Sequence, residues 1–386
     1  MYTKPQTLSI RPDRERIEWI EQRVREYRLD GFPEQPGWAL GTPATHVSRL
    51  VDHWLGEFSW ERWEATLNQF GHCRCQVDGT PIHFLHARPT GPSNGMALVL
   101  LHGWPGSVFE FYDALKELLS DPSWPFDVIV PSLPGFAFST PLQAPTGCRR
   151  IAALVDTLVT RHLGFDSYIA QGGDWGAVVA SWLGFDHADA CRAIHLNAEG
   201  IRVHGAPQYE PILEGDWTDE ERRHFAFERG ELGRELGYYV QQSTRPQTLG
   251  HAMRNDPVGA AAWISEKFHG WSNLGDDEDP GDYFGWDRLL TNALLYVVPD
   301  SFVTATWIYA GHDLHDPSTL PPGARIEIPT GFVSCADPIV PPPPRSMIER
   351  AHNLVWWRED DAGHFAAFEK PQAFVAGLKD FINQVC

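Results

Sequence analysis

An aspartate flanked by glycines is the clearest chemical signal in this chain. The stretch Gly172–Gly176 reads Gly-Gly-Asp-Trp-Gly, after the apolar run 167–170 and before the apolar run 177–183. This pattern predicts a strand, a tight turn and a helix, with Asp174 at the point of the turn where many enzymes carry a nucleophilic serine. A carboxylate suits displacement at strained or activated sp3 carbon, and it leaves an ester that a second step must hydrolyse.

A second turn supports this chemical role. An aspartate on a tight turn is also an ordinary turn residue or helix N-cap, so the motif alone does not decide. The apolar strand predicted at 97–101 runs into His102–Gly106, which reads His-Gly-Trp-Pro-Gly. Such a turn supplies one backbone N–H to a developing oxyanion, and the residue after the nucleophile supplies another. The expected donors are Trp104 and Trp175.

A general base and its orienting acid are expected late in the chain, after the last strands. His364 lies in a loop that follows the apolar run 354–357, and Asp337 follows the strand predicted at 332–335. A single histidine is more often a surface or core residue, but the order along the chain favours His364 as the base. The less well placed acids are Asp313 and Asp316, which precede the strand, and Asp360 and Asp361, which lie too close to the histidine.

Alternating strands and helices must position these groups. Strands are predicted at 97–101, 128–130, 168–170 and 193–196, with helices over 108–119 and 151–163 between them. This order implies a parallel sheet covered on both faces. Upstream, helices are predicted over 12–29, 46–58 and 60–69, followed by a hairpin around Asp78-Gly79; downstream, strands are predicted at 326–328, 332–335 and 354–357, and a helix over 374–385.

A helical segment interrupts the alternation. We expect residues 1–92 to form an N-terminal wrapping region with the first strands, and 93–204 the first part of the core. Residues 205–310 are expected to form a helical cap, and 311–386 the second part of the core. A sheet that resumes after a helical insertion is the layout of a core with a lid over its site.

Composition excludes several functions. The 386 residues are 42% hydrophobic and carry a formal net charge of −20, which argues against nucleic acid and anionic membranes as partners. Six cysteines form no Cys-x-x-Cys pair, so reduced thiols are expected and a zinc site is not favoured. The sequence has no apolar signal region and no run of membrane-spanning length, so a cytoplasmic location is expected.

Several motifs together resemble one family. The chain is similar nearly end to end to epoxide hydrolases of the microsomal and juvenile-hormone type, including their soluble fungal and bacterial members. The matching segments are Leu8–Ile10 through Trp60–Trp63, His102–Ser107, Pro131–Phe136, Gln171–Gly176, Tyr238–Thr248 and Gly363–Ala367. The resemblance implies an α/β-hydrolase fold with a mostly parallel central sheet, a helical cap insertion and an N-terminal wrapping segment.

The resemblance also implies two tyrosines in the cap that face the nucleophile. They carry over to Tyr238 and to Tyr309, although the surroundings of Tyr309 depart from the usual pattern. Tyr296 and Tyr283 are alternatives for the second position, and Tyr239 is expected to point elsewhere on its helix. Many relatives carry Glu where this chain has Asp337. The mammalian forms have an N-terminal membrane helix, which this sequence does not show.

These residues predict hydrolysis of an epoxide to a vicinal diol without a metal or organic cofactor. Asp174 would open the ring, Tyr238 and Tyr309 would protonate the leaving oxygen, and His364 with Asp337 would activate water against the ester. The expected substrate is a small apolar or aryl epoxide, and a homodimer is left open. The alternatives are a haloalkane dehalogenase, which also uses an aspartate on such a turn, and a ligand-binding protein that keeps the fold without turnover.

Overall fold

A mostly parallel sheet forms the centre of the computed structural model, which describes residues 4–33, 37–203, 216–275, 277–315, 319–339 and 341–386. Within these ranges nine strands follow the order β1-β2-β3-β5-β4-β6-β7-β8-β9. Three pairs of neighbouring strands are antiparallel, namely β1 with β2, β2 with β3, and β3 with β5. All the other neighbouring pairs are parallel. The strands are β1 (Gln6–Leu8), β2 (His72–Val77), β3 (Thr80–Ala87), β4 (Ala97–Leu101), β5 (Asp127–Pro131), β6 (Tyr168–Gly172), β7 (Cys191–Leu196), β8 (Ile326–Cys335) and β9 (His352–Asp360).

Two sequence predictions about the strands meet different outcomes. The hairpin around Asp78-Gly79 is confirmed as β2 and β3. The separate strands predicted at 326–328 and 332–335 are wrong, because β8 is one continuous strand. Its register against β9 shifts between Ile326 and Pro329. Proline cannot donate a hydrogen bond to the ladder, so it breaks the pattern locally without ending the strand.

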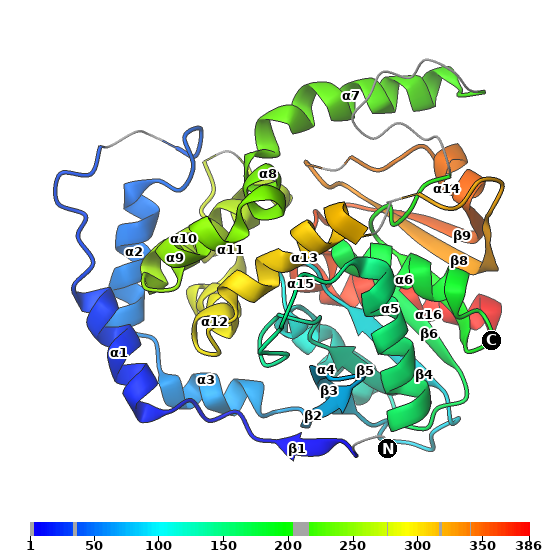
Figure 1. Cartoon of the computed structure of the whole chain (residues 1–386), viewed down its shortest axis with the longest axis horizontal. Helices are drawn as coiled ribbons and strands as arrows, with labels where there is room; N and C mark the ends of the chain where they lie inside the picture. Colours follow the sequence, from blue (N-terminus) through cyan, green and yellow to red (C-terminus); the bar gives the residue numbers. More distant parts are fainter. Residues whose placement is uncertain (1–3, 34–36, 204–215, 276, 316–318, 340) are drawn as a thin grey trace.

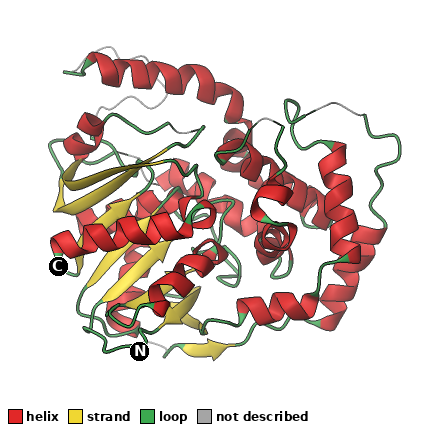
Figure 2. Ribbon diagram, turned by 180° about the vertical axis from the view of Figure 1, so that it is seen from behind, coloured by secondary structure: helices red, strands yellow, loops and turns green. Residues whose placement is uncertain are grey.

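Helices cover the sheet on both faces, as predicted. Helices α5 (Cys148–Thr157) and α6 (Trp175–Asp186) pack together on one face, and α4 (Tyr112–Ser120) and α16 (Pro371–Val385) pack together on the other. Figure 2 shows α16 lying across the sheet on the side that Figure 1 turns away from the reader. Residues Trp175–Gly184 of α6 are all buried, which fits a helix that is apolar on every side. The turn that carries Asp174 is thus fixed within the core.

A helical segment lies between β7 and β8 and forms a layer beside the sheet (Figure 1). The cap was predicted to begin at residue 205, which lies outside the described residues. It was predicted to end at residue 310, which lies within helix α13. The helices of this segment are α7 (Asp219–Glu235), α8 (Gly237–Thr244), α9 (Pro246–Met253), α10 (Pro257–Trp271), α11 (Pro280–Phe284), α12 (Trp286–Val297) and α13 (Phe302–His315). We refer to α7–α13 as the cap.

The N-terminal segment braces the cap against the sheet. Its helices are α1 (Arg14–Arg25), α2 (Ala44–Gly56) and α3 (Trp60–Leu67). The helices α1 and α2 run along the cap in Figure 1, while β1 joins the edge of the sheet. Helix α2 pairs Arg49 with Asp282 and His53 with Asp287 of the cap. Exposed ion pairs stabilise little, so the buried face of α2, with Val47, Leu50 and Trp54, contributes most of the attachment.

The length and hydropathy of the described helices bear on whether one of them could span a membrane. No single helix in the described ranges is long and apolar enough to cross a membrane. One pair, α12 with Phe302–Leu314, meets the length and composition only when the two are joined across a 77° bend. Leu289–Val297 of α12 are all buried within the molecule, as in a core helix.

Candidate active site

The turn that carries Asp174 is confirmed as a strand–turn–helix between β6 and α6. Asp174 adopts φ 48° and ψ −132°, a conformation that a non-glycine residue rarely holds without support from its surroundings. The glycines make the turn tight enough. A Cβ at Gly172 would lie 2.1 Å from the Gly176 carbonyl oxygen, and one at Gly176 would lie 2.0 Å from that of Leu101. The strained backbone of this turn therefore holds the Asp174 carboxylate at the carboxyl end of β6, near the middle of the sheet.

The turn after β4 presents a donor to this carboxylate. The Trp104 backbone N–H donates to Asp174 Oδ1 over 2.8 Å. Helix α12 fixes the turn, because Asn292 donates to the Pro105 carbonyl and Tyr296 donates to the Gly106 carbonyl. Tyr296 is thereby engaged in holding the backbone, which removes it as an alternative lid tyrosine. The other predicted donor, the N–H of Trp175, belongs to the first residue of α6.

His364 lies between two carboxylates. Its Nδ1 is 2.6 Å from Asp337 Oδ2, and its Nε2 is 3.3 Å from Asp174 Oδ2. The histidine follows β9 and Asp337 follows β8, so the carboxyl ends of neighbouring parallel strands bring them together. Burial favours a neutral imidazole, but Asp337 and Asp174 outweigh it and raise the pKa of His364 well above its usual value. Both carboxylates therefore favour the protonated form of His364 in the resting site.

The other acids considered from sequence have different partners. Asp360 accepts from the Ala362 N–H and Asp361 pairs with Lys370, both within the loop and its flank. Asp313 accepts from the Tyr239 hydroxyl over 2.8 Å. Asp316 lies outside the described residues. Among the described acids, Asp337 alone makes the contact that an orienting acid for His364 needs.

The two predicted lid tyrosines meet over Trp104. Tyr238 of α8 stacks on the Trp104 indole at 5.3 Å between ring centroids, and Tyr309 of α13 lies edge-on to it at 5.9 Å. Their own rings are 5.8 Å apart. Burial raises the pKa of Tyr309 well above its usual value, and Tyr238 and Asp174 add to the shift. The other candidate, Tyr283, is 40% exposed.

Sequence reasoning missed Lys267 of α10. Its side chain is only 4% exposed, and its ammonium lies 4.7 Å from the Tyr238 ring centroid and 2.7 Å from Glu266 Oε1. A cation over an aromatic face is attracted to the ring, and more strongly to the ring of a phenol that is losing its proton. Glu266 and His269 stand close to Lys267 in the same helix, so no local pattern in the sequence marks this lysine as buried.

Sequence reasoning also missed Glu369 at the end of the histidine loop. Its carboxylate accepts backbone N–H groups from both neighbours of His364, Gly363 at 3.0 Å and Phe365 at 3.1 Å. It also accepts the Asn273 N–H, at the end of α10, over 3.2 Å. The His364 N–H in turn donates to the Trp271 carbonyl. These bonds fix the backbone of His364 and connect it to the cap.

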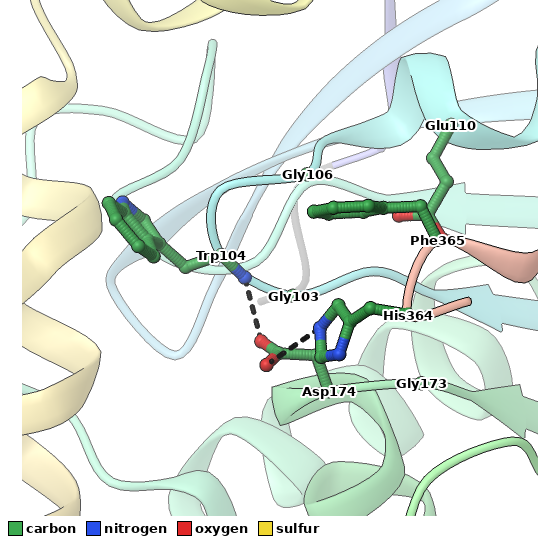
Figure 3. Close-up of a pocket in the computed structure, with 8 residues that line it drawn as sticks. All are labelled: Gly103, Trp104, Gly106, Glu110, Gly173, Asp174, His364 and Phe365. Atoms are coloured by element: carbon green, nitrogen blue, oxygen red, sulfur yellow. Dashed lines mark hydrogen bonds and ion pairs between the residues drawn. The ribbon is translucent and has the colours of Figure 1, made fainter. Parts of the chain in front are cut away.

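A small cavity lies beside Asp174 (Figure 3). Its lining includes Asp174, His364, Phe365, Gly103, Gly106 and Glu110. Glu110 was not anticipated from sequence. It lies on η1 (Val108–Phe111), a short 3-10 turn that replaces the first part of the helix predicted over 108–119. The Ser107 hydroxyl accepts the Phe109 N–H, so the turn begins with its own cap.

One cluster outside this site has ligand types that suit a metal ion. Glu199, His224 and Glu228 bring their ligand atoms within 4.8 Å of one another. The guanidinium of Arg202 already pairs with both carboxylates. A guanidinium in that position supplies the positive charge that a cation would bring, so the residues present do not favour a metal. The cluster instead joins the segment after β7 to helix α7.

Comparisons with known proteins agree with this geometry. Residues 5–111 match the family model described as epoxide hydrolase N terminus, and residues 97–229 match that of the alpha/beta hydrolase fold. A putative epoxide hydrolase of Stigmatella aurantiaca is 38% identical over 90% of this chain and 78% of its own length.

Two solved structures extend the likeness. The epoxide hydrolase of Aspergillus niger superposes with a TM-score of 0.81 at 30% identity, over 100% of this chain and 97% of that one. The juvenile hormone epoxide hydrolase of the silkworm Bombyx mori gives a TM-score of 0.85 at 26% identity, over 99% and 95%. The predicted resemblance and the predicted α/β-hydrolase fold are confirmed. Matching such enzymes along nearly its whole length, the chain belongs to the epoxide hydrolase family.

Proposed function

We propose that this epoxide hydrolase converts its substrate to a vicinal diol in two half-reactions, through a covalent ester on Asp174. One observation carries the proposal: the two oxygens of this carboxylate have different partners. Oδ1 accepts the Trp104 N–H, and Oδ2 faces His364. A carboxylate bound in this way is held for attack, and the same two partners are the groups that a later hydrolysis of its ester requires.

Ring opening is the first half-reaction. Asp174 attacks an epoxide carbon while Tyr238 and Tyr309 donate hydrogen bonds to the ring oxygen, and one of them transfers its proton. The raised pKa of Tyr309 keeps that phenol protonated at neutral pH. An alkoxide is a far stronger base than a phenolate, so a phenol is acid enough for this transfer. Lys267, beside the Tyr238 ring, stabilises negative charge on it.

Ester formation prepares the base for the second half-reaction. In the resting site the Asp174 carboxylate helps to keep His364 protonated. Alkylation removes that negative charge, so the pKa of His364 falls and the imidazolium can return a proton to the tyrosinate. The neutral imidazole, oriented by Asp337, then takes a proton from the attacking water. The N–H groups of Trp104 and Trp175 hold the oxyanion, and loss of one such donor typically costs about 100- to 1000-fold in rate.

The aromatic surroundings favour an apolar or aryl epoxide. Trp104, Tyr238 and Trp271 contact one another around the site, with Tyr309 completing the group. Such rings bind apolar groups by area and by edge-to-face contacts. The proposed chemistry uses protein side chains and water only. A cytoplasmic location and a homodimer stay predictions.

A single turnover in oxygen-18 water tests the covalent route. With enzyme in excess over styrene oxide, the first diol should carry unlabelled oxygen from Asp174, and the enzyme should gain the label. A diol that is labelled in the first turnover would mean direct attack by water. Parallel incubation with 1-chlorobutane separates the alternatives, because chloride release without diol indicates a dehalogenase, and neither product indicates a protein without turnover.

A further inference from the structure

The cavity beside Asp174 has the size of one water molecule. The space open to the centre of a water-sized sphere is about 10 Å³, which is about the minimum that one water needs. A water held there also needs two to four polar partners. The lining provides the Asp174 carboxylate, His364 and the Glu110 carboxyl group. Figure 3 shows Glu110 reaching from η1 toward the loop of His364 and Phe365.

Gly106 makes room for the Glu110 carboxyl group. A Cβ at position 106 would lie 2.7 Å from Glu110 Oε2, so any side chain there would displace the carboxyl group. The backbone at Gly106 is fixed by the hydrogen bond from Tyr296, and Ser107 donates to Asn292 of α12. Because this loop is held on both sides of the glycine, the position of the carboxyl group is set by the fold.

Burial of the Glu110 carboxyl group costs free energy, because burial disfavours its ionised form. Glu110 also lines a second small cavity, together with Phe268, Phe365 and Phe368. Burial raises the pKa of Glu110 to about 8; Asp174 also raises it, and His364 opposes the shift. A carboxyl group in such surroundings, with no part in ring opening, is the kind of group that enzymes place for chemistry.

We infer that Glu110 positions the water that hydrolyses the Asp174 ester, as the partner opposite His364. The inference rests on the proposed function. The water oxygen bonds to Cγ of Asp174 while one of its protons passes to His364 Nε2 and Glu110 accepts a hydrogen bond from its other O–H. The tetrahedral intermediate then breaks the bond between Cγ and the substrate oxygen. That oxygen leaves as the second diol hydroxyl with a proton from His364. Asp174 keeps the oxygen of the water, and the remaining proton of the water passes from the new carboxyl group to His364, which restores the resting site.

The charges around Glu110 change in the course of the proposed reaction. In the resting site Asp174 raises the pKa of Glu110 and His364 lowers it. Ester formation removes the charge of Asp174, and the proton transfer from His364 to the tyrosinate removes the opposing charge, so the place of Glu110 in the cavity carries the inference. Glu369, the other acid near Glu110, is engaged with backbone N–H groups of the histidine loop. Of these two glutamates, Glu110 is the one that lines the cavity.

The test separates alkylation from hydrolysis in single turnovers of styrene oxide. Glu110→Gln keeps the shape of the side chain, and Gly106→Ala displaces an unaltered Glu110; the φ of Gly106 is not in the left-handed region, so alanine fits the backbone. Both should slow decay of the ester by about 10- to 100-fold, the range for a hydrogen bond to a charged group. Alkylation should stay within about 3-fold of wild type. Glu117→Gln, an exposed change on α4, is the control.

Each outcome decides the inference. Ester accumulation in both variants, with melting temperatures near that of the control, supports it, as does a crystallographic water within hydrogen-bond distance of Glu110 and His364 in the wild type but not in Gly106→Ala. Ester decay at the control rate in Glu110→Gln overturns it. An equal fall in alkylation and hydrolysis also overturns it, because Glu110 would then be structural. If no ester forms in the wild type or in His364→Gln, the proposed function itself fails.

Discussion

The core and the cap hold their parts of the site by different means. In the core, Asp174, His364 and Asp337 stand at the carboxyl ends of strands and are fixed by hydrogen bonds and a strained backbone. In the cap, Tyr238 and Tyr309 are held mainly by contacts between aromatic rings, with side-chain hydrogen bonds of Tyr309 to Trp175 and Tyr238. Hydrogen bonds to backbone set atomic positions within tenths of an ångström, whereas ring packing tolerates small shifts and exchanges.

This difference suits the two half-reactions. In the proposed mechanism, hydrolysis of the ester always takes place at the same carboxyl group, so the groups that catalyse it can be held rigidly. Ring opening must accept a substrate whose shape the core does not determine. We therefore expect substitutions in the core to change rates by larger factors than substitutions in the cap, and to affect a different step.

The largest effect is expected at the nucleophile. Asp174→Ala removes the attacking group, so diol formation should fall by about 10⁴-fold or more, and no ester should appear in intact mass spectra. The fold should persist, because alanine removes the carboxylate without adding bulk. Asp166→Asn, an exposed change before β6, serves as the control. Substantial residual turnover of the alanine variant would show that another residue is the nucleophile.

The next largest effect is expected at the acid that orients the base. Asp337→Asn should slow ester hydrolysis by about 10³- to 10⁴-fold, because the imidazole loses its charged partner and its orientation. Alkylation should fall far less, so the ester accumulates. Asp337→Glu should recover part of the rate. Stopped-flow traces would contradict this assignment if alkylation fell as much as hydrolysis.

An intermediate effect is expected at the lid tyrosines. Tyr238→Phe and Tyr309→Phe should each slow alkylation by about 10- to 100-fold, since each loses one donor to the ring oxygen. Hydrolysis of an ester already formed should keep its rate. Tyr239→Phe, whose hydroxyl binds Asp313, should have a much smaller effect. If Tyr309→Phe alkylates at the wild-type rate, the second donor is another residue.

A smaller effect is expected at Lys267. Lys267→Met keeps the apolar stem of the side chain but removes the cation beside Tyr238, and alkylation should slow by about 3- to 10-fold. Lys267→Arg should restore much of this loss. A purely structural role would lower the melting temperature and leave the alkylation constant unchanged.

Buried histidines on or next to strands are expected to make the stability of the sheet depend on pH. Burial lowers the pKa of His102 to about 4, of His195 to about 3 and of His352 to about 4, and all three lie on or next to strands. These groups stay neutral in the folded state and bind protons when unfolded, so stability is complete above about pH 6.5 and falls toward pH 4. Amide exchange near pH 5.5 should therefore rise first in the sheet. Faster opening of the cap alone would contradict this.

Local chemistry explains how much of the site could be predicted. Asp174 could be predicted because the glycines around it allow only a tight turn, and His364 because its motif follows the last strand. Asp337 could be predicted from its place after a strand, although the sequence divides that strand wrongly around Pro329. The prediction of Tyr309 depended on the family resemblance alone, and the contacts of this residue with Trp104 and Tyr238 agree with it.

The sequence by itself determined the family and the strand–turn–helix at Asp174, because both depend on motifs of residues that are neighbours in the chain. It predicted the roles of Asp174, Asp337 and His364 from the places of these residues after successive strands. Only the tertiary structure decided that Glu110 shares a cavity with His364 and that Lys267 lies over Tyr238. Neither residue stands in a distinctive local pattern. Their environments are made by segments that are far apart in sequence, and burial next to a charge is a property of the packed molecule alone.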